Sequence, residues 1–521
     1  MRRRNLLLTL LSALMLALSR LPIHLGWMVF FAWLPLLYIF ETGKAKSADL
    51  LRMGFIMSII YMSIVFYWIT LVTIPGLIGM MAFYGLVYYI LFYAINRIFL
   101  LLPRWRYLGF ISIMITFEYI QNFGETRFPW FNLAYSLADY THLIQFADVG
   151  GVVGLSALIL LINVLIHLML PSSQKWLEQR GRNHYVNASP RRRQVISLVA
   201  IIIIFISWWG YGENCLKNLP LEKHDAKIFV VQPSIEARDR WKPEQYDKSL
   251  ELFRKLTLEA AADSAKLVIW PEGAMIGDLA SDYAAQRDLQ KILDEAQVDI
   301  FTGFQHYEPD INHPRGERSY NAASLFQPDN FHNELYFKNI LVPVAERMLW
   351  MDIFPFLWKL DLGQANWEFG TKLAYYESGG YRFSPSICYE LAFPEIFHNM
   401  AIPRDTLSGE FNKCDFLINI TNDGWFGTSY GPWLHAMMAK FRAIENRIQI
   451  YRSANTGISL IVDPKGRILS RTKLNEVCVI SAPLYTTPRI PVIRRIYKYP
   501  FIFVGIALLL ALIARIKKTG G

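Results

Sequence analysis

Three short segments in the polar half of the chain carry residue types that together perform acyl transfer. They are Trp270-Pro271-Glu272-Gly273, Tyr336-Phe337-Lys338 and Ile387-Cys388-Tyr389-Glu390. A cysteine attacks a carbonyl group as a thiolate, so it needs a base within hydrogen-bond reach, and Glu272 is the candidate. A fixed cation and a backbone N–H stabilise the resulting oxyanion, and Lys338 and the N–H of Tyr389 are the candidates. The pattern predicts Cys388 as a nucleophile with Glu272 and Lys338 as its catalytic partners.

The local sequence predicts that these side chains follow strands. Lys266 to Trp270 is a short apolar run that ends in a Pro and Gly turn at Glu272. Phe383 to Ile387 leads in the same way to Cys388, and a helix is expected from Pro394. The reactive atoms are therefore expected at strand ends, where side chains are held rigidly and still face an opening.

The other cysteines lack such a context. Cys215, Cys414 and Cys478 are interpreted as small buried hydrophobic residues. The cysteine count assigns no disulfide, and a catalytic Cys388 must remain a free thiol.

The segment from about Ile228 to Ala482 resembles the nitrilase superfamily, whose Glu-Lys-Cys triad lies in an α-β-β-α sandwich. With its flanking apolar runs, nearly the whole chain resembles the apolipoprotein N-acyltransferase family. The resemblance implies a multi-spanning α-helical membrane protein with an inserted α/β domain of the nitrilase-like sandwich type. The motifs that carry it are Val268-Ile269-Trp270-Pro271-Glu272, Tyr336-Phe337-Lys338-Asn339, Ser386-Ile387-Cys388-Tyr389-Glu390 and Thr421-Asn422-Asp423-Gly424-Trp425-Phe426-Gly427.

Length and composition indicate a membrane protein with a large polar insert. The chain has 521 residues, of which 53% are hydrophobic, and this is too apolar for an ordinary soluble protein. A helix needs about 20 apolar residues to cross a bilayer. Eight spans are expected, at roughly 5 to 20, 24 to 41, 51 to 73, 76 to 102, 107 to 123, 150 to 170, 194 to 210 and 499 to 515. The predicted division is a membrane region at 1–210, a catalytic domain at 226–485 and a final span at 499–515.

Basic residues predict the orientation of these spans. The net charge is +10, but Lys and Arg gather at the ends of apolar runs, so a nucleic-acid surface is not indicated. Clusters at Arg2 to Arg4, near Arg104 and from Lys175 to Arg193 fall on one face if eight spans are present. The positive-inside rule makes that face cytoplasmic, with both termini there and the catalytic domain outside. The basic cluster from Arg489 to Lys498 would lie on the outer face and does not follow this rule. Contact with lipid phosphates is an alternative explanation for these basic residues.

The resemblance also implies the reaction and its partners. A fatty acyl chain passes from a phospholipid, typically phosphatidylethanolamine, through a thioester on Cys388 to the amino-terminal diacylglyceryl-cysteine of a bacterial lipoprotein. This is the last step of lipoprotein maturation, in the inner membrane. No metal or other cofactor is required.

Two other functions are alternatives to this one. A membrane-tethered amidase would use the same triad on a small C–N substrate, but eight spans are excessive for tethering. A transporter or receptor with a degenerate sandwich domain is disfavoured by the intact triad and by the few charges within the spans. The aromatic stretch from Phe128 to Tyr135 is similar to one in the acyltransferases, although an interfacial aromatic belt explains it equally well.

Further residues are expected around the triad. Glu346 and Glu390 are expected to hold Lys338 protonated or fix its direction, with surface ion pairs as the alternative. The sequence before Glu346, Val342-Pro343-Val344-Ala345, departs from the Phe-Gly usual in the family and leaves the loop shape open. The resemblance assigns substrate binding to Trp241, whereas Trp425 and Phe426 are expected in the pocket wall.

The remaining candidates carry weaker signals. Trp350, Trp358 and Trp367 lie in an aromatic insertion that we interpret as a lid dipping into the outer leaflet, or as a small packed subdomain. Glu118 falls within a predicted span and has either a functional or a packing role, with Arg127 as one possible partner. His398 and His435 lack metal-ligand spacing and are interpreted as satisfied structural histidines.

Overall fold

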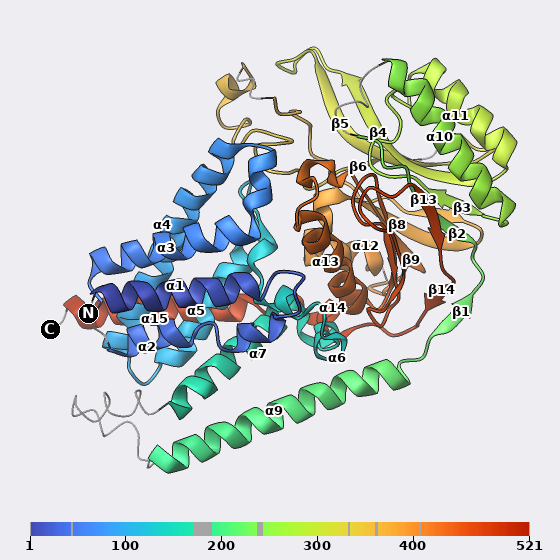
Figure 1. Cartoon of the computed structure of the whole chain (residues 1–521). Coiled ribbons are helices and arrows are strands. Elements are labelled where there is room, and N and C mark those ends of the chain that lie inside the picture. The colour runs from blue at the N-terminus through green and yellow to red at the C-terminus, as the bar shows by residue number, and fades with distance from the viewer. Residues whose placement is uncertain are drawn as a thin grey trace. The chain divides into compact units, whose positions relative to one another are not determined.

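The computed structural model describes residues 2–42, 45–170, 190–236, 243–331, 334–359, 363–405 and 408–519. The chain divides into two compact units (Figure 1). The first, here called the helical unit, comprises Met1–Asn122, Pro129–Asn218 and Arg495–Gly521. The second, the sheet unit, comprises Phe123–Phe128 and Leu219–Arg494.

The helical unit is built from apolar helices at the predicted spans. These are α1 (Arg2–Leu18), α2 (Leu34–Thr42), α3 (Ser47–Val65), α4 (Ile74–Leu101), α5 (Arg106–Ile120), α7 (Ala147–Met169), α9 (Pro190–Asn218) and α15 (Phe501–Thr519). Short helical turns join them: η1 (Gly26–Phe30), η2 (Tyr67–Leu71), η3 (Pro129–Phe131), η4 (Leu133–Leu137) and α6 (Thr141–Ile144). Among the described helices, four are long and apolar enough to cross a membrane, namely α3, α4, α7 and α9.

The helices differ from the eight predicted spans in three respects. The second span is divided into η1 and α2, because Pro35 lacks an N–H and favours the first turn of a new helix. The α1 and α5 helices have only 17 and 15 residues. The α9 helix continues past residue 210 to Asn218, and the Lys217–Glu213 ion pair of 2.6 Å supports its last turns. Most of the basic run from Lys175 to Arg193 lies outside the described residues.

The aromatic stretch that follows α5 is buried in the helical unit from Pro129 onward. Trp130 and Phe131 are 1% and 4% exposed, so they are core residues rather than an interfacial belt. Arg20 donates to the carbonyl oxygens of Trp130, at 2.9 Å, and Asn132. Glu118 Oε1 accepts a hydrogen bond of 3.0 Å from the N–H of Leu133. The buried charges of this unit thus hold an irregular loop in place, which supports the packing role for Glu118.

The sheet unit contains two six-stranded sheets within its described residues. In order, the first consists of β13 (Cys478–Ser481), β2 (Ile228–Gln232), β3 (Leu267–Ile269), β4 (Asp299–Pro309), β5 (Glu317–Phe326) and β6 (Tyr336–Phe337). The second consists of β12 (Ile468–Arg471), β11 (Leu460–Val462), β10 (Gln449–Ala454), β9 (Phe416–Thr421), β8 (Tyr381–Ile387) and β7 (Tyr376–Ser378). A separate pair joins β1 (Glu222–His224) to β14 (Leu484–Thr486).

The two sheets pack face to face between two layers of helices. Helices α10 (Pro243–Ala262) and α11 (Tyr283–Ala296) cover the first sheet, and α12 (Pro394–Ala401) and α13 (Gly431–Asn446) cover the second. The sheets meet where Ser453 Oγ of β10 donates to the Val231 carbonyl of β2 at 2.8 Å. The predicted α-β-β-α sandwich is therefore confirmed. The short helix α14 (Val492–Ile496) follows the sandwich in the sequence.

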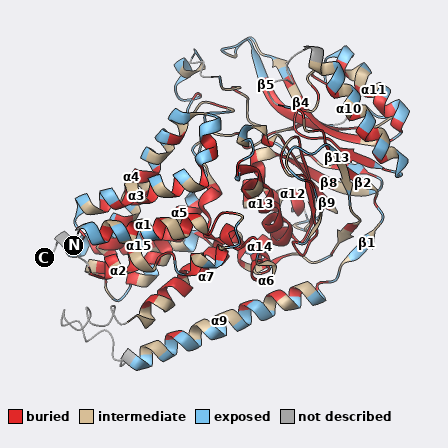
Figure 2. Cartoon of the chain, viewed as in Figure 1, coloured by how far each residue is buried: buried red, intermediate tan, exposed pale blue. Residues whose placement is uncertain are grey.

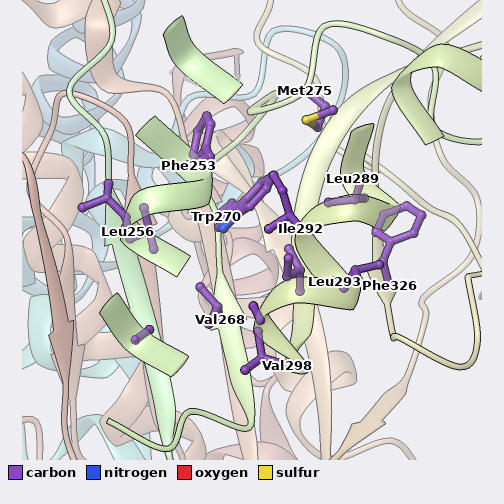
Figure 3. Close-up of a cluster of buried hydrophobic side chains, with 14 of the residues drawn as sticks. Phe253, Leu256, Val268, Trp270, Met275, Leu289, Ile292, Leu293, Val298 and Phe326 are labelled. Carbon is purple, nitrogen blue, oxygen red and sulfur yellow. The ribbon is translucent and has the colours of Figure 1, made fainter. Parts of the chain in front are cut away.

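The core beneath α10 and α11 fixes the strand that leads to Glu272. Trp270 is fully buried, stacks on Phe253 with ring centroids 4.5 Å apart, and donates to Thr257 Oγ1 at 3.0 Å (Figure 3). Figure 2 shows that the strands of both sheets are largely buried. Burial on both faces explains why the parallel strands read as continuous apolar runs.

Parallel pairing brings the predicted segments to the same end of their sheets. Strand β8 pairs with β9 in parallel, with Ile387 opposite Ile420. Strand β3 pairs in parallel with both β2 and β4. The segments after β3, β8 and β9, which carry Glu272, Cys388 and Asn422, thus follow strand ends that a rigid scaffold positions.

Candidate active site

Cys388 occupies a strained turn at the end of β8. It begins η7 (Cys388–Ala392) and has a φ of 50°, in the left-handed region that residues other than glycine rarely adopt. Glu390 stabilises this turn by accepting a hydrogen bond of 2.7 Å from the N–H of Ile387. Such strain persists only where the surroundings impose it, and it concentrates at functional sites.

Glu272 is held by two hydrogen bonds from different sheets. Its Oε1 accepts from Asn321 Nδ2 of β5 at 2.7 Å, and its Oε2 accepts from the N–H of Asn422, after β9, at 2.7 Å. Gly303 of β4 permits the close approach, since a Cβ there would lie 2.8 Å from the N–H nitrogen of Gly273. The carboxylate therefore has one fixed direction.

Lys338 is a fully buried ammonium between two carboxylates. Its Nζ lies 2.7 Å from Glu346 Oε1 and 3.5 Å from Glu272 Oε1. The backbone N–H of Lys338 donates to the Asn321 carbonyl at 2.9 Å, which anchors the backbone. Burial alone lowers the pKa of Lys338, but the charges of Glu346 and Glu272 outweigh it and raise the pKa above the usual lysine value. The two carboxylates thus favour the charged form of Lys338.

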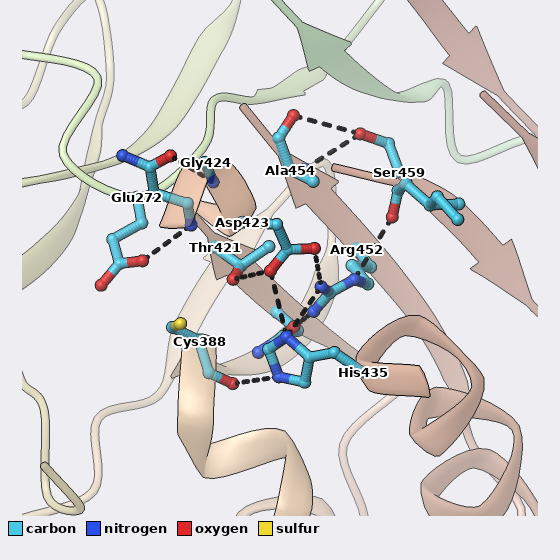
Figure 4. Close-up of polar contacts among 12 residues, drawn as sticks. Glu272, Cys388, Thr421, Asp423, Gly424, His435, Arg452, Ala454 and Ser459 are labelled. Carbon is cyan, nitrogen blue, oxygen red and sulfur yellow. Dashed lines mark hydrogen bonds and ion pairs between the residues drawn. The ribbon is translucent and has the colours of Figure 1, made fainter. Parts of the chain in front are cut away.

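Cys388 is a thiol in the resting site. Burial raises the pKa of Cys388 well above its ordinary value, Glu272 raises it further, and Lys338 only partly opposes these effects. In Figure 4 the Cys388 side chain and the Glu272 carboxylate lie on the same side of the network formed by Asp423, Arg452 and His435. The three predicted triad residues interact electrostatically. The arrangement suits removal of the thiol proton by Glu272 when an electrophile arrives.

Both additional carboxylates support Lys338, in different ways. Glu346 pairs with its ammonium directly and also accepts from the N–H of Val342 at 2.8 Å. The loop whose shape the sequence left open is a tight turn in which Val344 has a φ of 68°.

Glu390 acts on the backbone beside Lys338. It accepts from the Tyr336 hydroxyl at 2.8 Å and from the N–H of Asn339 at 2.6 Å. Burial raises the pKa of Glu390 to about 7, although the N–H of Ile387 and the Tyr336 hydroxyl oppose this.

A buried network that the sequence did not reveal lies behind Cys388. Asp423 of η8 (Asp423–Phe426) pairs with Arg452 Nη2 at 2.7 Å, and His435 Nε2 lies 3.1 Å from the Cys388 carbonyl oxygen (Figure 4). His435 is a buried histidine with hydrogen-bond partners, as expected, but its contact with the backbone of the nucleophile was not predicted. The contacts of Asn321 were not predicted either. The local sequence carries no specific signal for these contacts, because other polar residues occur in the same strands and helix.

The remaining predicted residues differ in their contacts and in their exposure. The Tyr389 hydroxyl donates to the Arg127 carbonyl at 2.7 Å, and its ring stacks near Phe128. Phe426 packs edge-on against His435, whereas Trp425 is 62% exposed. Trp241 lies outside the described residues.

A pocket lined mainly by apolar side chains reaches Glu272. Apart from Glu272 itself, its wall includes Ile235, Leu250, Phe253 and Met275. The site therefore has an apolar space next to its base.

The described part of the aromatic insertion is partly exposed and partly packed. Trp350 is 46% exposed and Phe356 is 68% exposed, and η6 (Pro355–Lys359) has no buried residue. Trp358 is held beneath the Arg347 guanidinium, 5.0 Å from the ring centroid.

The cysteines and potential metal ligands add no further site. All four cysteines are free thiols. Among the residues that the structure describes, no group of three or more His, Cys, Asp or Glu side chains is placed to hold a metal ion.

Comparisons with known proteins cover both units. Residues 12–165 match the apolipoprotein N-acyltransferase N-terminal domain, and residues 227–485 match the carbon-nitrogen hydrolase family. A solved structure of an amidase from Nesterenkonia sp. is similar at 17% identity and a TM-score of 0.38, over 52% of this chain and 94% of that one.

Curated relatives match over nearly their whole length. The apolipoprotein N-acyltransferase of Geobacter metallireducens is 29% identical over 92% of this chain and 89% of the relative. That of Chlorobaculum tepidum is 28% identical over 98% of this chain and 96% of the relative. Because two domain models match in order and these relatives are covered almost end to end, the chain belongs to the apolipoprotein N-acyltransferase family.

Proposed function

We propose that this protein N-acylates the amino-terminal diacylglyceryl-cysteine of bacterial lipoproteins. The observation that carries the proposal is the buried Lys338 ammonium between Glu272 and Glu346, beside a strained Cys388. The apolar helices and the names of the relatives support a lipid substrate over a small soluble amide.

In the first half-reaction, Cys388 becomes acylated. Glu272 takes the thiol proton as the sulfur bonds to an ester carbonyl carbon of a phospholipid, for which we propose phosphatidylethanolamine. Lys338 and the N–H of Tyr389 stabilise the oxyanion. Collapse of this intermediate breaks the C–O ester bond, Glu272 returns the proton to the leaving oxygen, and lysophospholipid departs.

In the second half-reaction, the lipoprotein amine takes the acyl group. The neutral α-amino group attacks the thioester carbonyl and Glu272 accepts the amine proton. The C–S bond then breaks and the thiol regains its proton, leaving an amide. A buried, water-poor site suits this chemistry because water would otherwise hydrolyse the thioester. The pocket that reaches Glu272 is lined mainly by apolar side chains.

We further propose the predicted orientation in the inner membrane, with both termini cytoplasmic and the sheet unit on the outer side. The exposed apolar side chains of the insertion then enter the outer leaflet as a lid, which the exposure of Phe354 and Phe356 supports.

Replacing Cys388 with Ala should abolish acyl-enzyme formation from phospholipid, because no other thiol has the Glu272 and Lys338 partners. Intact mass spectrometry should show one added fatty acyl group on the wild-type chain, removable with hydroxylamine. Cys414→Ala, which removes a buried cysteine elsewhere in the sheet unit, is the matched control and should acylate normally. Equal acylation of both variants would reject the assignment of Cys388.

The raised pKa of Cys388 predicts an unusual pH profile for alkylation by iodoacetamide. Below the pKa, the thiolate fraction increases about tenfold per pH unit, so the alkylation rate of Cys388 should still be increasing above pH 9. The alkylation rate of a cysteine introduced at Tyr283, which is 86% exposed, should stop increasing near the ordinary thiol pKa of about 8.5. A plateau for Cys388 below pH 8 would indicate a preformed thiolate and contradict the account.

The lid and orientation are tested with cysteines introduced separately at Phe356 and Tyr283. A membrane-impermeant maleimide should label both in intact spheroplasts. The fluorescence emission of a bimane probe attached at position 356 should shift to the blue when phosphatidylethanolamine vesicles are added. The same probe at position 283 should show no shift. If the maleimide labels the cysteines only after the spheroplasts are lysed, the proposed orientation is wrong. If the bimane emission shifts equally at the two positions, the proposed lid is wrong.

A further inference from the structure

The carbonyl group of the nucleophile is held by a buried histidine. His435 of α13 is 1% exposed, and its Nε2 lies 3.1 Å from the carbonyl oxygen of Cys388 (Figure 4). A carbonyl oxygen only accepts hydrogen bonds, so Nε2 must carry the hydrogen. The imidazole therefore donates directly to the backbone of the reactive cysteine.

The other side of the imidazole is fixed by an ion pair. His435 Nδ1 lies 3.1 Å from both Asp423 Oδ1 and Arg452 Nη2. Asp423 and Arg452 are buried and lie 2.7 Å apart. Asp423 is in turn bonded to Thr421 Oγ1 at 3.1 Å. Because the ring carries its hydrogen on Nε2, its Nδ1 accepts from Arg452 Nη2. This hydrogen bond and the one to Cys388 leave the ring with one orientation.

The hydrogen bond from His435 acts on more than the carbonyl it touches. The C=O of Cys388 and the N–H of Tyr389 belong to one planar peptide group and point in opposite directions. Fixing the oxygen therefore fixes the direction of the N–H. A hydrogen bond to the oxygen also polarises the peptide and strengthens the N–H as a donor.

We propose that His435 is a positioning residue for the oxyanion site: it orients and polarises the Cys388–Tyr389 peptide so that the Tyr389 N–H binds the developing oxyanion. The inference rests on the proposed function, which assigns that N–H to the oxyanion. The left-handed φ of Cys388 gives His435 a second effect, since its hydrogen bond helps to hold a backbone conformation that is otherwise unfavourable.

Two reactions of Cys388 separate this role from simple structural support. Alkylation by iodoacetamide displaces iodide and creates no oxyanion. Acylation by a fatty p-nitrophenyl ester passes through one. A defect in the oxyanion site slows only acylation, whereas a misplaced sulfur slows both reactions.

The test uses the full chain in detergent and three variants. His435→Leu removes the donor. His435→Gln retains it, because the glutamine amide reaches a position similar to that of Nε2. The matched control is His398→Leu, which removes another buried histidine of the sheet unit, bonded to Asn446 at 2.8 Å.

We expect His435→Leu to lower the rate of the p-nitrophenolate burst by as much as about 100-fold, because a misdirected Tyr389 N–H would lose much of its effect as an oxyanion donor. Its alkylation of Cys388, followed on that peptide by mass spectrometry, should keep the wild-type rate. His435→Gln should recover most of the burst rate, and His398→Leu should keep both rates. An unchanged burst in His435→Leu, or an equal fall in both reactions, would overturn the proposal.

The same proteins distinguish this proposal from the proposed function. Wild-type protein that reacts with the p-nitrophenyl ester but never with phospholipid would reject the lipid donor. The comparison between His435 variants would still decide the positioning role, because it needs only the ester.

Discussion

The site depends on one buried cation. An isolated ammonium in a protein interior is unfavourable by many kcal/mol, and it persists only where carboxylates and hydrogen bonds compensate for lost hydration. Glu346 and Glu272 supply that compensation at 2.7 and 3.5 Å from Lys338. In return, the ammonium allows two carboxylates to remain close together. The base and the oxyanion-binding group are thus parts of one electrostatic cluster, and neither is expected to work without the other.

The rest of the sheet unit orients this cluster. Asn321 links two of its members, because its side chain binds Glu272 and its carbonyl accepts from the N–H of Lys338. Glu390 connects the Cys388 turn with the backbone after β6. His435 fixes the Cys388 carbonyl from behind. Each contact joins segments distant in sequence, so the geometry requires the complete sandwich rather than any single motif.

The sequence predicted what depends on local patterns. Glu272, Lys338 and Cys388 stand out because a charged or reactive residue follows a short apolar run in each case, and the resemblance of these motifs to the nitrilase superfamily implies the sandwich. The roles of Asn321 and Arg452, and the contact between His435 and the Cys388 carbonyl, were not predicted, because the partners lie far away in sequence. The division of the second span and the length of α9 were also missed, since hydropathy does not mark where one helix stops and another begins.

We expect Lys338 to serve the reaction rather than lipid binding, and single-turnover kinetics separate these two roles. The variant Lys338→Met removes the cation, and Lys338→Met combined with Glu346→Gln also removes one of the carboxylates that would otherwise be left unpaired. For both, we expect the rate of Cys388 acylation from phospholipid to fall at least about 100-fold. The dissociation constant for a non-hydrolysable phospholipid ether should stay close to the wild-type value. A large loss of affinity with an unchanged single-turnover rate would contradict the account.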